Sequence, residues 1–317
     1  MMPTATSPRL AGAPHGYEEP ATRPSLAEAR AYCKTLAESH YENFHVATAF
    51  LPARVRPHFH AIYCYCRLSD DLGDEVHDPQ LALRLLDEWE QMMHEMYDAP
   101  ERVKHPVLVA LAETVRECDI PRDPFAKLLI AFRQDQTKLR HASMQELIEY
   151  SESSANPVGQ LVLYVSGYRQ PELHAYSDSI CTGLQLANFW QDAGEDLRER
   201  SRIYIPQDAM ERFGVTREQM ERGEATSQYR AMLADLCSQA RKMLNDGAPL
   251  EQRVDKELAS TLWLFRNGGL SILDAIAAID YDTLNRRPVV TKQRKAALLA
   301  GAVWRRMVSI VTPRRSA

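Results

Sequence analysis

Four acidic residues stand close together in the segment that runs from Arg67 to Glu75. If this segment is helical, Asp70 and Asp74 share one face, because residues four apart in a helix lie one above the other. Like charges at this spacing repel each other by about 0.2–0.5 kcal/mol per pair. A cation that bound both carboxylates would remove that repulsion.

A second acidic cluster contains Asp192 and Asp196, which again share a helical face. The segments before the two clusters, 61–66 and 182–190, are free of charged side chains, which favours two buried helices. Buried carboxylates need a cation, and ligands that are all oxygen indicate Mg²⁺ rather than zinc. Because Mg²⁺ usually shares its site with substrate phosphates, the pattern predicts a protein that binds and ionises a diphosphate ester. The alternative is two solvated acidic helix faces.

The elements that must position these carboxylates all have helical patterns. Only 13 of the 317 residues are Gly, no strand-like alternation is found, and Ser25 with Glu28 forms a capping-box pattern. We expect an all-α, single-domain protein with one core. The helices are expected near residues 26–39, 55–76, 79–97, 105–118, 123–137, 144–166, 171–199, 226–246, 252–281 and 291–310. We expect a disordered arm at 1–24, a helical domain at 25–290 and a basic helix or tail at 291–317.

Composition excludes several functional classes. No apolar run reaches the length of a membrane-spanning helix, and no Gly-rich phosphate loop indicates NADPH or ATP. The six Cys show no paired spacing, so we interpret them as reduced thiols of a cytoplasmic protein. The net charge is −5, but no acidic residue follows Asp282, which suits an anionic partner. The tail has no nucleic-acid motif, so we expect no nucleic acid.

The order of these motifs resembles that of the squalene and phytoene synthases between about Ser39 and Arg287. The resemblance rests on His40-Tyr-Glu-Asn-Phe44, Tyr63-x-x-x-Arg67-x-x-Asp70-Asp71-x-x-Asp74, Ala155-Asn-Pro-Val-Gly159, Gln185-x-x-Asn188-x-x-x-Asp192-x-x-x-Asp196 and Arg202-x-Tyr204. Within the family, stretches such as Asn188-Phe-Trp-Gln-Asp192 and Arg286-Arg-Pro288 look most like the bacterial hydroxysqualene synthases of the hopanoid pathway. The resemblance implies an isoprenoid synthase-type helical bundle around a central cavity.

The resemblance also implies roles for individual residues. Metal ligands would be Asp70, Asp74, Asn188, Asp192 and Asp196. Contacts with the substrate would come from His40, Phe44, Arg67, Gly159, Gln185, Asn188, Arg202, Tyr204 and Arg286, and Tyr63 would act in catalysis. Two positions differ from common family members: Gln191 stands where relatives often have Arg, and Gly269 aligns with a Tyr. We expect Gln191 to orient the water that ends the reaction.

The implied activity is the Mg²⁺-dependent conversion of presqualene diphosphate to hydroxysqualene without NADPH. Presqualene diphosphate, squalene or phytoene synthase activity, in which two prenyl diphosphates condense, is the first alternative. A chain-elongating prenyltransferase and a non-catalytic assembly factor are further alternatives. The second acidic cluster does not suit the former, and retention of all four aspartates disfavours the latter.

The C-terminal segment from Lys292 to Val311 mixes apolar and basic residues. If it is helical, Leu299, Val303 and Met307 line one side. Such a helix could lie on an anionic membrane surface, or it could pack on the core with a charged outer face. We therefore expect a cytoplasmic protein, either free or peripheral on the inner face of the membrane.

Overall fold

The computed structural model of the protein describes residues 9–40 and 53–311, with the backbone alone for His40 and for 307–311. Over these ranges the chain is all-α and has no β-strand, which confirms the expected fold class. The contacts divide the chain into two compact units, and each is described by itself. Unit 1 comprises residues 1–137 and 160–168, and unit 2 comprises residues 138–159 and 169–317.

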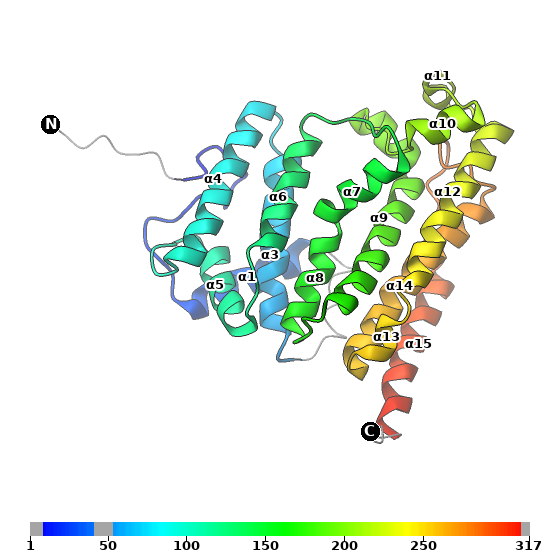
Figure 1. Cartoon of the computed structure of the whole chain (residues 1–317). Coiled ribbons are helices and arrows are strands. Elements are labelled where there is room, and N and C mark those ends of the chain that lie inside the picture. The colour runs from blue at the N-terminus through cyan, green and yellow to red at the C-terminus, as the bar shows by residue number, and fades with distance from the viewer. Residues whose placement is uncertain (1–8, 41–52, 312–317) are drawn as a thin grey trace. The chain divides into compact units, whose positions relative to one another are not determined.

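Unit 1 is built around one helix that carries the first acidic cluster. That helix, α3, is contacted by α1, α4, α5 and α6. Inside, Tyr65 of α3 stacks on Trp89 at 5.3 Å between ring centroids and meets Phe125 edge-on at 5.0 Å. The helices of this unit are α1 (Leu26–His40), α3 (Arg56–Asp74), α4 (Pro79–Asp98), α5 (Pro106–Cys118) and α6 (Asp123–Asp135) (Figure 1).

Local sequence explains where these helices begin. The capping box at the start of α1 forms as expected: Glu28 N donates to Ser25 Oγ (3.3 Å), and Ser25 N donates to Glu28 Oε2 (2.8 Å). Helix α4 begins with Pro79, whose missing N–H costs nothing at that position, and Asp78 accepts from Gln80 N. The three expected helices that correspond to α1, α4 and α5 end within one residue of their predicted ends.

The expectation of a disordered arm does not hold for residues 9–24. Leu10 is fully buried, and Tyr17 is 6% exposed. Leu10 N donates to Glu88 Oε2 of α4 (2.8 Å), and Arg23 Nε donates to Val103 O (3.1 Å). We call Arg9–Pro24 the N-terminal strap. Residues 1–8 lie outside the described residues.

Unit 2 is built around the second long helix, α9, which contacts α7, α11, α12, α13 and α14. Gly183 lets α9 and α12 approach closely, since a Cβ there would lie 2.8 Å from Leu244 Cγ. The helices are α7 (Met144–Ser154), α9 (Pro171–Arg200), α10 (Gln207–Phe213), α11 (Arg217–Glu221), α12 (Ser227–Asp246), α13 (Leu250–Arg253), α14 (Lys256–Ala278) and α15 (Lys292–Val311). Helix α8 (Asn156–Val165) begins in unit 2 and continues into unit 1.

Two details differ from the expected helices. The helix expected at 144–166 is broken at Ala155 into α7 and α8, because Pro157 has no N–H to donate to the carbonyl four residues earlier and its ring clashes with that carbonyl. The short helices α10 and α11 were not expected. Gly269 lies against α9, where a Cβ would be 2.7 Å from Leu184 Cδ2, so close packing explains this glycine.

The C-terminal helix α15 packs beside α14 (Figure 1). Leu298 and Ala302 are buried, and Arg306 Nη2 donates to Glu257 Oε1 (2.9 Å). Leu299 is half-buried, Val303 is exposed, and the side chain of Met307 lies outside the described residues. Within the described residues, the basic C-terminal segment is therefore a helix that packs on unit 2 through Leu298 and Ala302. None of the described helices combines the length and apolar character that a membrane crossing requires.

Candidate active site

The first acidic cluster forms a polar stripe along α3. Tyr63, Arg67 and Asp70 are half-buried and Asp74 is exposed, whereas Leu68, Ser69 and Leu72 between them are buried. The spacing of three and four residues places the four polar side chains on one side of the helix. We call Asp70–Asp74 the first aspartate motif. It lies in unit 1.

Asp71, the second residue of this motif, has a different environment. It is 4% exposed, Arg67 Nη2 forms an ion pair with its Oδ1, and Tyr17 OH donates to its Oδ2. Arg67 Nη1 lies 3.8 Å from Asp70 Oδ2. Asp71 is part of the motif recognised in the sequence but had no predicted role, and Tyr17 was not predicted at all. The four-residue spacing from Arg67 could have identified Asp71 as an intrahelical partner, but nothing in the sequence pointed to Tyr17.

The second acidic cluster lies on α9, in unit 2. We call Asp192–Asp196 the second aspartate motif. Gln185, Asn188, Asp192 and Asp196 are accessible to differing degrees, whereas most positions between them, such as Ala187, Trp190 and Ala193, are buried. As on α3, the polar stripe is flanked by buried positions of the helix. The side chain of Asp192 is 28% exposed and that of Asp196 is 13% exposed.

The charge of Asp196 is not well compensated. Burial, and then the neighbouring charge of Asp192, raise the pKa of Asp196 to about 6. Arg200 Nη1 lies 3.9 Å from its Oδ1, and Arg202 N donates to its main-chain oxygen (3.1 Å). A carboxylate with a raised pKa beside a second carboxylate is an arrangement that a cation stabilises.

The segment that follows α14, which we call the 280s loop (Asp280–Pro288), supplies a cation to this motif. Arg287 Nε lies 2.7 Å from Asp192 Oδ1 and 3.0 Å from Glu195 Oε2. We expected Arg286 to be the functional arginine here. Among the described residues Arg286 makes no ion pair, and Arg287 is the residue that the loop conformation brings to Asp192.

Three contacts hold the 280s loop along α9. Gln191 Nε2 donates to Pro288 O (2.7 Å), Arg198 Nη1 donates to Leu284 O (2.6 Å), and Gly194 N donates to Thr283 O (3.2 Å). A Cβ on Gly194 would lie 2.4 Å from Leu284 O, so only glycine allows this approach. Gln191 is buried and its amide nitrogen is engaged by the loop. This hydrogen bond ties the amide nitrogen of Gln191 to the loop, and the expected role of Gln191 in orienting water stays a prediction.

Arg202 and Tyr204 lie in the segment after α9. Ile203 N between them donates to Leu139 O (3.0 Å), and Tyr204 stacks on Phe189 with ring centroids 3.8 Å apart. Phe189 follows Asn188 directly, so an aromatic wall stands beside the polar stripe of α9.

Gly159 of α8 makes a close approach to α9. A Cβ there would lie 2.4 Å from Ser177 Oγ and 2.5 Å from Cys181 Sγ. This contact explains the small residue by helix packing. Two further expected residues cannot be placed: Phe44 and the side chain of His40 lie outside the described residues.

The donor chemistry of both motifs fits Mg²⁺. Every candidate ligand is oxygen, and the guanidinium of Arg287 shows that Asp192 and Glu195 accept a cation. In the described part of the chain, no group of three or more His, Cys, Asp or Glu is arranged to hold a metal. Mg²⁺ does not require such a cage, because it usually binds one or two carboxylates together with substrate phosphates.

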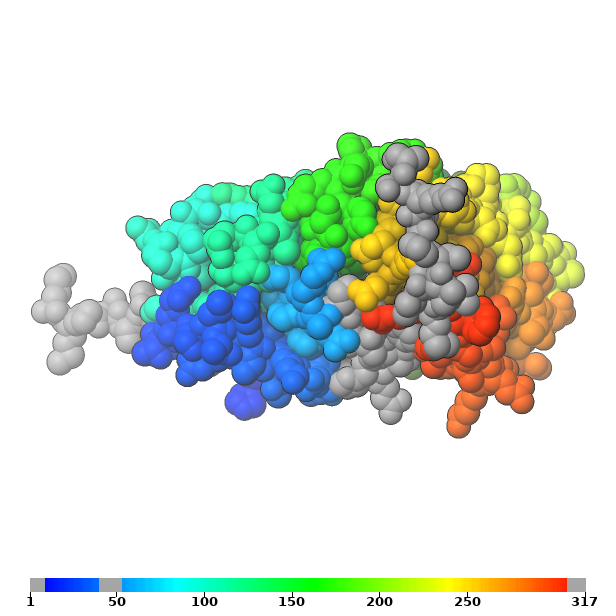
Figure 2. All heavy atoms as spheres, turned by 90° about the horizontal axis from the view of Figure 1, so that it is seen from below, coloured from blue at the N-terminus to red at the C-terminus, as the bar shows by residue number. Residues whose placement is uncertain are grey.

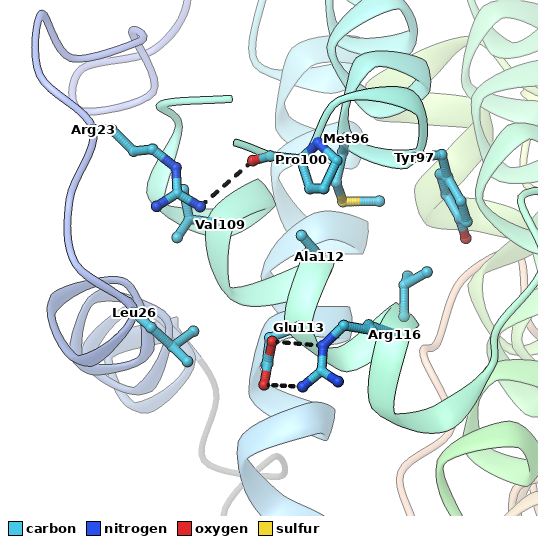
Figure 3. Close-up of a pocket in the computed structure, with 10 residues that line it drawn as sticks. Arg23, Leu26, Met96, Tyr97, Pro100, Val109, Ala112, Glu113 and Arg116 are labelled. Carbon is cyan, nitrogen blue, oxygen red and sulfur yellow. Dashed lines mark hydrogen bonds and ion pairs between the residues drawn. The ribbon is translucent and has the colours of Figure 1, made fainter. Parts of the chain in front are cut away.

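A cavity in unit 1 is separate from the aspartate residues. It has a volume of about 360 Å³ and is lined by side chains from the strap, α1, α4 and α5, among them Arg23, Met96 and Arg116 (Figure 3). None of the expected site residues lines it.

Comparison with known proteins gives consistent results. The family model for "Squalene/phytoene synthase" matches residues 21–294. The chloroplastic phytoene synthase 2 of Oryza sativa subsp. japonica is 31% identical over 318 residues, which cover 96% of this chain and 78% of that protein. The crystal structure of squalene synthase HpnC from Alicyclobacillus acidocaldarius has 37% identity and a TM-score of 0.77, and covers 81% of this chain and 95% of that one. A dehydrosqualene synthase in complex with ligand has a TM-score of 0.79 at 23% identity, over 88% of this chain and 96% of that one, which shows likeness of fold.

Proposed function

This chain belongs to the squalene and phytoene synthase family, and on that premise we propose that it converts presqualene diphosphate to hydroxysqualene. The family consists of enzymes that join prenyl diphosphates head to head. In the proposed reaction the bond from carbon to diphosphate breaks, the carbocation rearranges, and water adds its oxygen and releases a proton. The observation that carries the proposal is the pair of carboxylate stripes, on α3 and on α9, each flanked by buried positions of its helix. The 37% identity to squalene synthase HpnC supports this branch of the family.

Each stripe contributes groups that suit a diphosphate ester. Asp70 and Asp74 in unit 1, and Asp192 and Asp196 with Asn188 in unit 2, would hold Mg²⁺. When bound, the metal would supply positive charge to the leaving diphosphate. Arg202 and Arg287 would add permanent charge, because a planar guanidinium matches phosphate oxygens.

Apolar residues beside the α9 stripe would keep bulk water away from a carbocation. Phe189 is buried, and the ring of Tyr204 covers one of its faces. Exclusion of water strengthens every electrostatic interaction in the site. A single admitted water molecule would then determine the product.

Condensation of two prenyl diphosphates is the second candidate, with phytoene, presqualene diphosphate or squalene as the product. It is favoured by the 31% identity to a phytoene synthase over most of the chain. The two candidates differ in substrate: one takes up a single presqualene diphosphate, and the other takes up two prenyl diphosphates.

Product analysis separates these activities. The purified protein is incubated with Mg²⁺ and either presqualene diphosphate, farnesyl diphosphate or geranylgeranyl diphosphate, with and without NADPH. We expect hydroxysqualene from presqualene diphosphate alone, without NADPH, and none after replacement of Asp70 or Asp192 by Asn. Efficient formation of presqualene diphosphate or phytoene would contradict the hydroxysqualene assignment. Unchanged turnover in folded Asp→Asn variants would contradict the metal-site assignment.

We also propose that α15 lies against an anionic membrane surface and that the protein is peripheral there. Trp304 is 65% exposed and Val303 is 43% exposed, and both follow the basic residues Lys292 and Lys295, which are also exposed. Part of this helix, in red, is at the surface in Figure 2. Exposed Trp and Lys on one helix are typical of helices that lie in the headgroup region, where each Lys contributes about 1 kcal/mol.

Sedimentation with vesicles tests the membrane proposal. We expect the full chain to bind vesicles that contain phosphatidylglycerol and not vesicles of phosphatidylcholine alone. Trp304→Ala with Lys295→Glu should weaken binding without unfolding, because neither side chain is buried. Equal sedimentation with both kinds of vesicle, or no effect of the substitutions, would show that α15 only packs on α14.

A further inference from the structure

The N-terminal strap reaches the first aspartate motif through one hydrogen bond. Tyr17 OH donates to Asp71 Oδ2, and the other carboxylate oxygen, Oδ1, faces Arg67 Nη2. A carboxylate that is 4% exposed requires such partners, because its desolvation is otherwise uncompensated. Asp71 is thus a structural member of the motif, held from one side by the strap and from the other by α3.

The position of Asp71 determines where the charge of Arg67 lies. The guanidinium sits between two acids: Nη2 contacts Asp71, whereas Nη1 is 3.8 Å from Asp70 Oδ2, beyond hydrogen-bonding distance. If Asp71 changed rotamer, Arg67 could move the short distance to Asp70. Arg67 would then compete with a metal ion for a proposed ligand.

Tyr17 is suited to hold Asp71 in place. Burial, and then the hydrogen bond to Asp71, raise the pKa of Tyr17 well above its usual value, so the phenol remains a donor at every physiological pH. A neutral donor stabilises the carboxylate without adding a second cation near Asp70.

The strap holds Tyr17 through contacts at both of its ends. On one side Leu10 is fully buried and its N donates to Glu88 Oε2, while Arg84 Nη2 donates to Ala11 O (2.7 Å). On the other side Arg23 reaches Val103 O and Pro100 O, the latter drawn in Figure 3. Between them, Gly16 has φ +92°, a backbone conformation that favours glycine, and its carbonyl accepts from Tyr32 OH (3.1 Å). Tyr17 is therefore placed by a chain segment anchored before and after it.

We propose that the N-terminal strap is a positioning element of the first aspartate motif, in which Tyr17 fixes Asp71 so that Arg67 stays paired with Asp71 and leaves Asp70 to the metal–diphosphate. This inference rests on the proposed function. Tyr17 is a positioning residue, since it acts through Asp71 and Arg67.

Calorimetric titration of the full chain with inorganic pyrophosphate in the presence of Mg²⁺ tests the strap. Tyr17→Phe removes one hydroxyl and should weaken pyrophosphate binding about tenfold, the factor expected for one hydrogen bond to a charged group. Tyr32→Phe removes another hydroxyl that binds the strap, at Gly16, and should leave the affinity within about twofold of wild type. Asp71→Asn should weaken binding as Tyr17→Phe does, because it releases Arg67.

The double variant distinguishes positioning from loss of stability. If Tyr17 acts through Asp71, adding Tyr17→Phe to Asp71→Asn should change the affinity little, although thermal stability falls further. If the Tyr17→Phe and Asp71→Asn variants both bind pyrophosphate with wild-type affinity, the proposed role of the strap is overturned and the proposed function is left intact. A wild-type protein that binds no pyrophosphate with Mg²⁺ would overturn both.

Discussion

At the scale of single residues, the second aspartate motif shows how an arginine compensates the negative charge of a carboxylate cluster in place of a metal. Asp192 and Glu195 share the guanidinium of Arg287, and that pair is partly exposed. Partly exposed ion pairs contribute at most about 1 kcal/mol, so this one can open when a divalent cation arrives. The released arginine would then be close to the diphosphate that accompanies the metal.

If a metal ion displaces Arg287 in this way, one substitution should change the affinity for the metal and the affinity for pyrophosphate in opposite directions. Arg287→Gln should raise the affinity for Mn²⁺ alone by up to about fivefold, because the metal no longer displaces a guanidinium. The same variant should bind pyrophosphate more weakly once metal is saturating. Both affinities are measured by calorimetry.

The matched control is Arg286→Gln, which removes the same charge one residue earlier. It should leave the affinity for Mn²⁺ alone unchanged. An equal gain in both variants would mean that net charge, and not the contact with Asp192, governs metal binding.

At the scale of elements, α9 is a platform on which the 280s loop lies. The loop is held by Gln191, Gly194 and Arg198, one side chain or backbone group per turn. Gly194 stands inside the second aspartate motif, where a better helix former would be expected from propensity alone. The glycine is explained by the carbonyl of Leu284, which occupies the space of its missing Cβ.

Gly194→Ala should therefore displace the loop and Arg287 with it. We expect lower thermal stability and a change in Mn²⁺ affinity in the direction seen for Arg287→Gln. The control is Gly268→Ala on α14, where a Cβ would meet no atom within 4 Å. That variant should be more stable by about 0.5–1 kcal/mol, the usual gain of Ala over Gly within a helix. If the melting temperatures of the Gly194→Ala and Gly268→Ala variants change in the same direction, this account of Gly194 is wrong.

Elements with strong local signals could be predicted from the sequence. The capping box at Ser25 predicted α1, and the uncharged segments before the acidic clusters predicted α3 and α9. The predicted ends of these three helices lie within two residues of the observed ends. The break at Ala155 was not predicted, although Pro157 is visible in the sequence. The strap was not predicted because Pro, Ala and Gly make up half of its residues, and the partner of Tyr17 lies 54 residues away. Arg287 was not distinguished from Arg286, since only the fold of the loop decides which one meets Asp192.

At the scale of the whole molecule, His105 in unit 1 and His141 in unit 2 are the histidines that are buried among the described residues. Burial lowers the pKa of His105 in unit 1 to about 4, and burial does the same for His141 in unit 2. His105 is fully buried, and Val107 N donates to its Nδ1 at the start of α5 (3.3 Å). Both histidines are neutral in the folded chain at neutral pH.

These histidines predict how stability depends on pH. Between pH 6.5 and about 4 the unfolded chain binds protons that the folded chain excludes, so the free energy of unfolding falls as the pH falls through this range. The loss is at most about 3 kcal/mol per histidine. His105→Asn keeps an acceptor for Val107 N and removes one of these titrations, so it should make the free energy of unfolding depend less steeply on pH over this range. Urea unfolding followed by circular dichroism at several pH values measures the free energy of unfolding. If this free energy depends on pH equally steeply in the variant and in the wild type, His105 does not contribute to the pH dependence.

The strap has a consequence for the order of events during synthesis. Arg9 and Leu10 leave the ribosome before their partners Glu95 and Glu88, which are made more than seventy residues later. The strap can dock only after α4 has been translated, and such long-range closures are slow compared with helix formation. Arg67 and Asp71 are thus synthesised before the residues of α4 to which the strap docks. The strap is therefore synthesised before the first aspartate motif but can complete that motif only after α4 has been made.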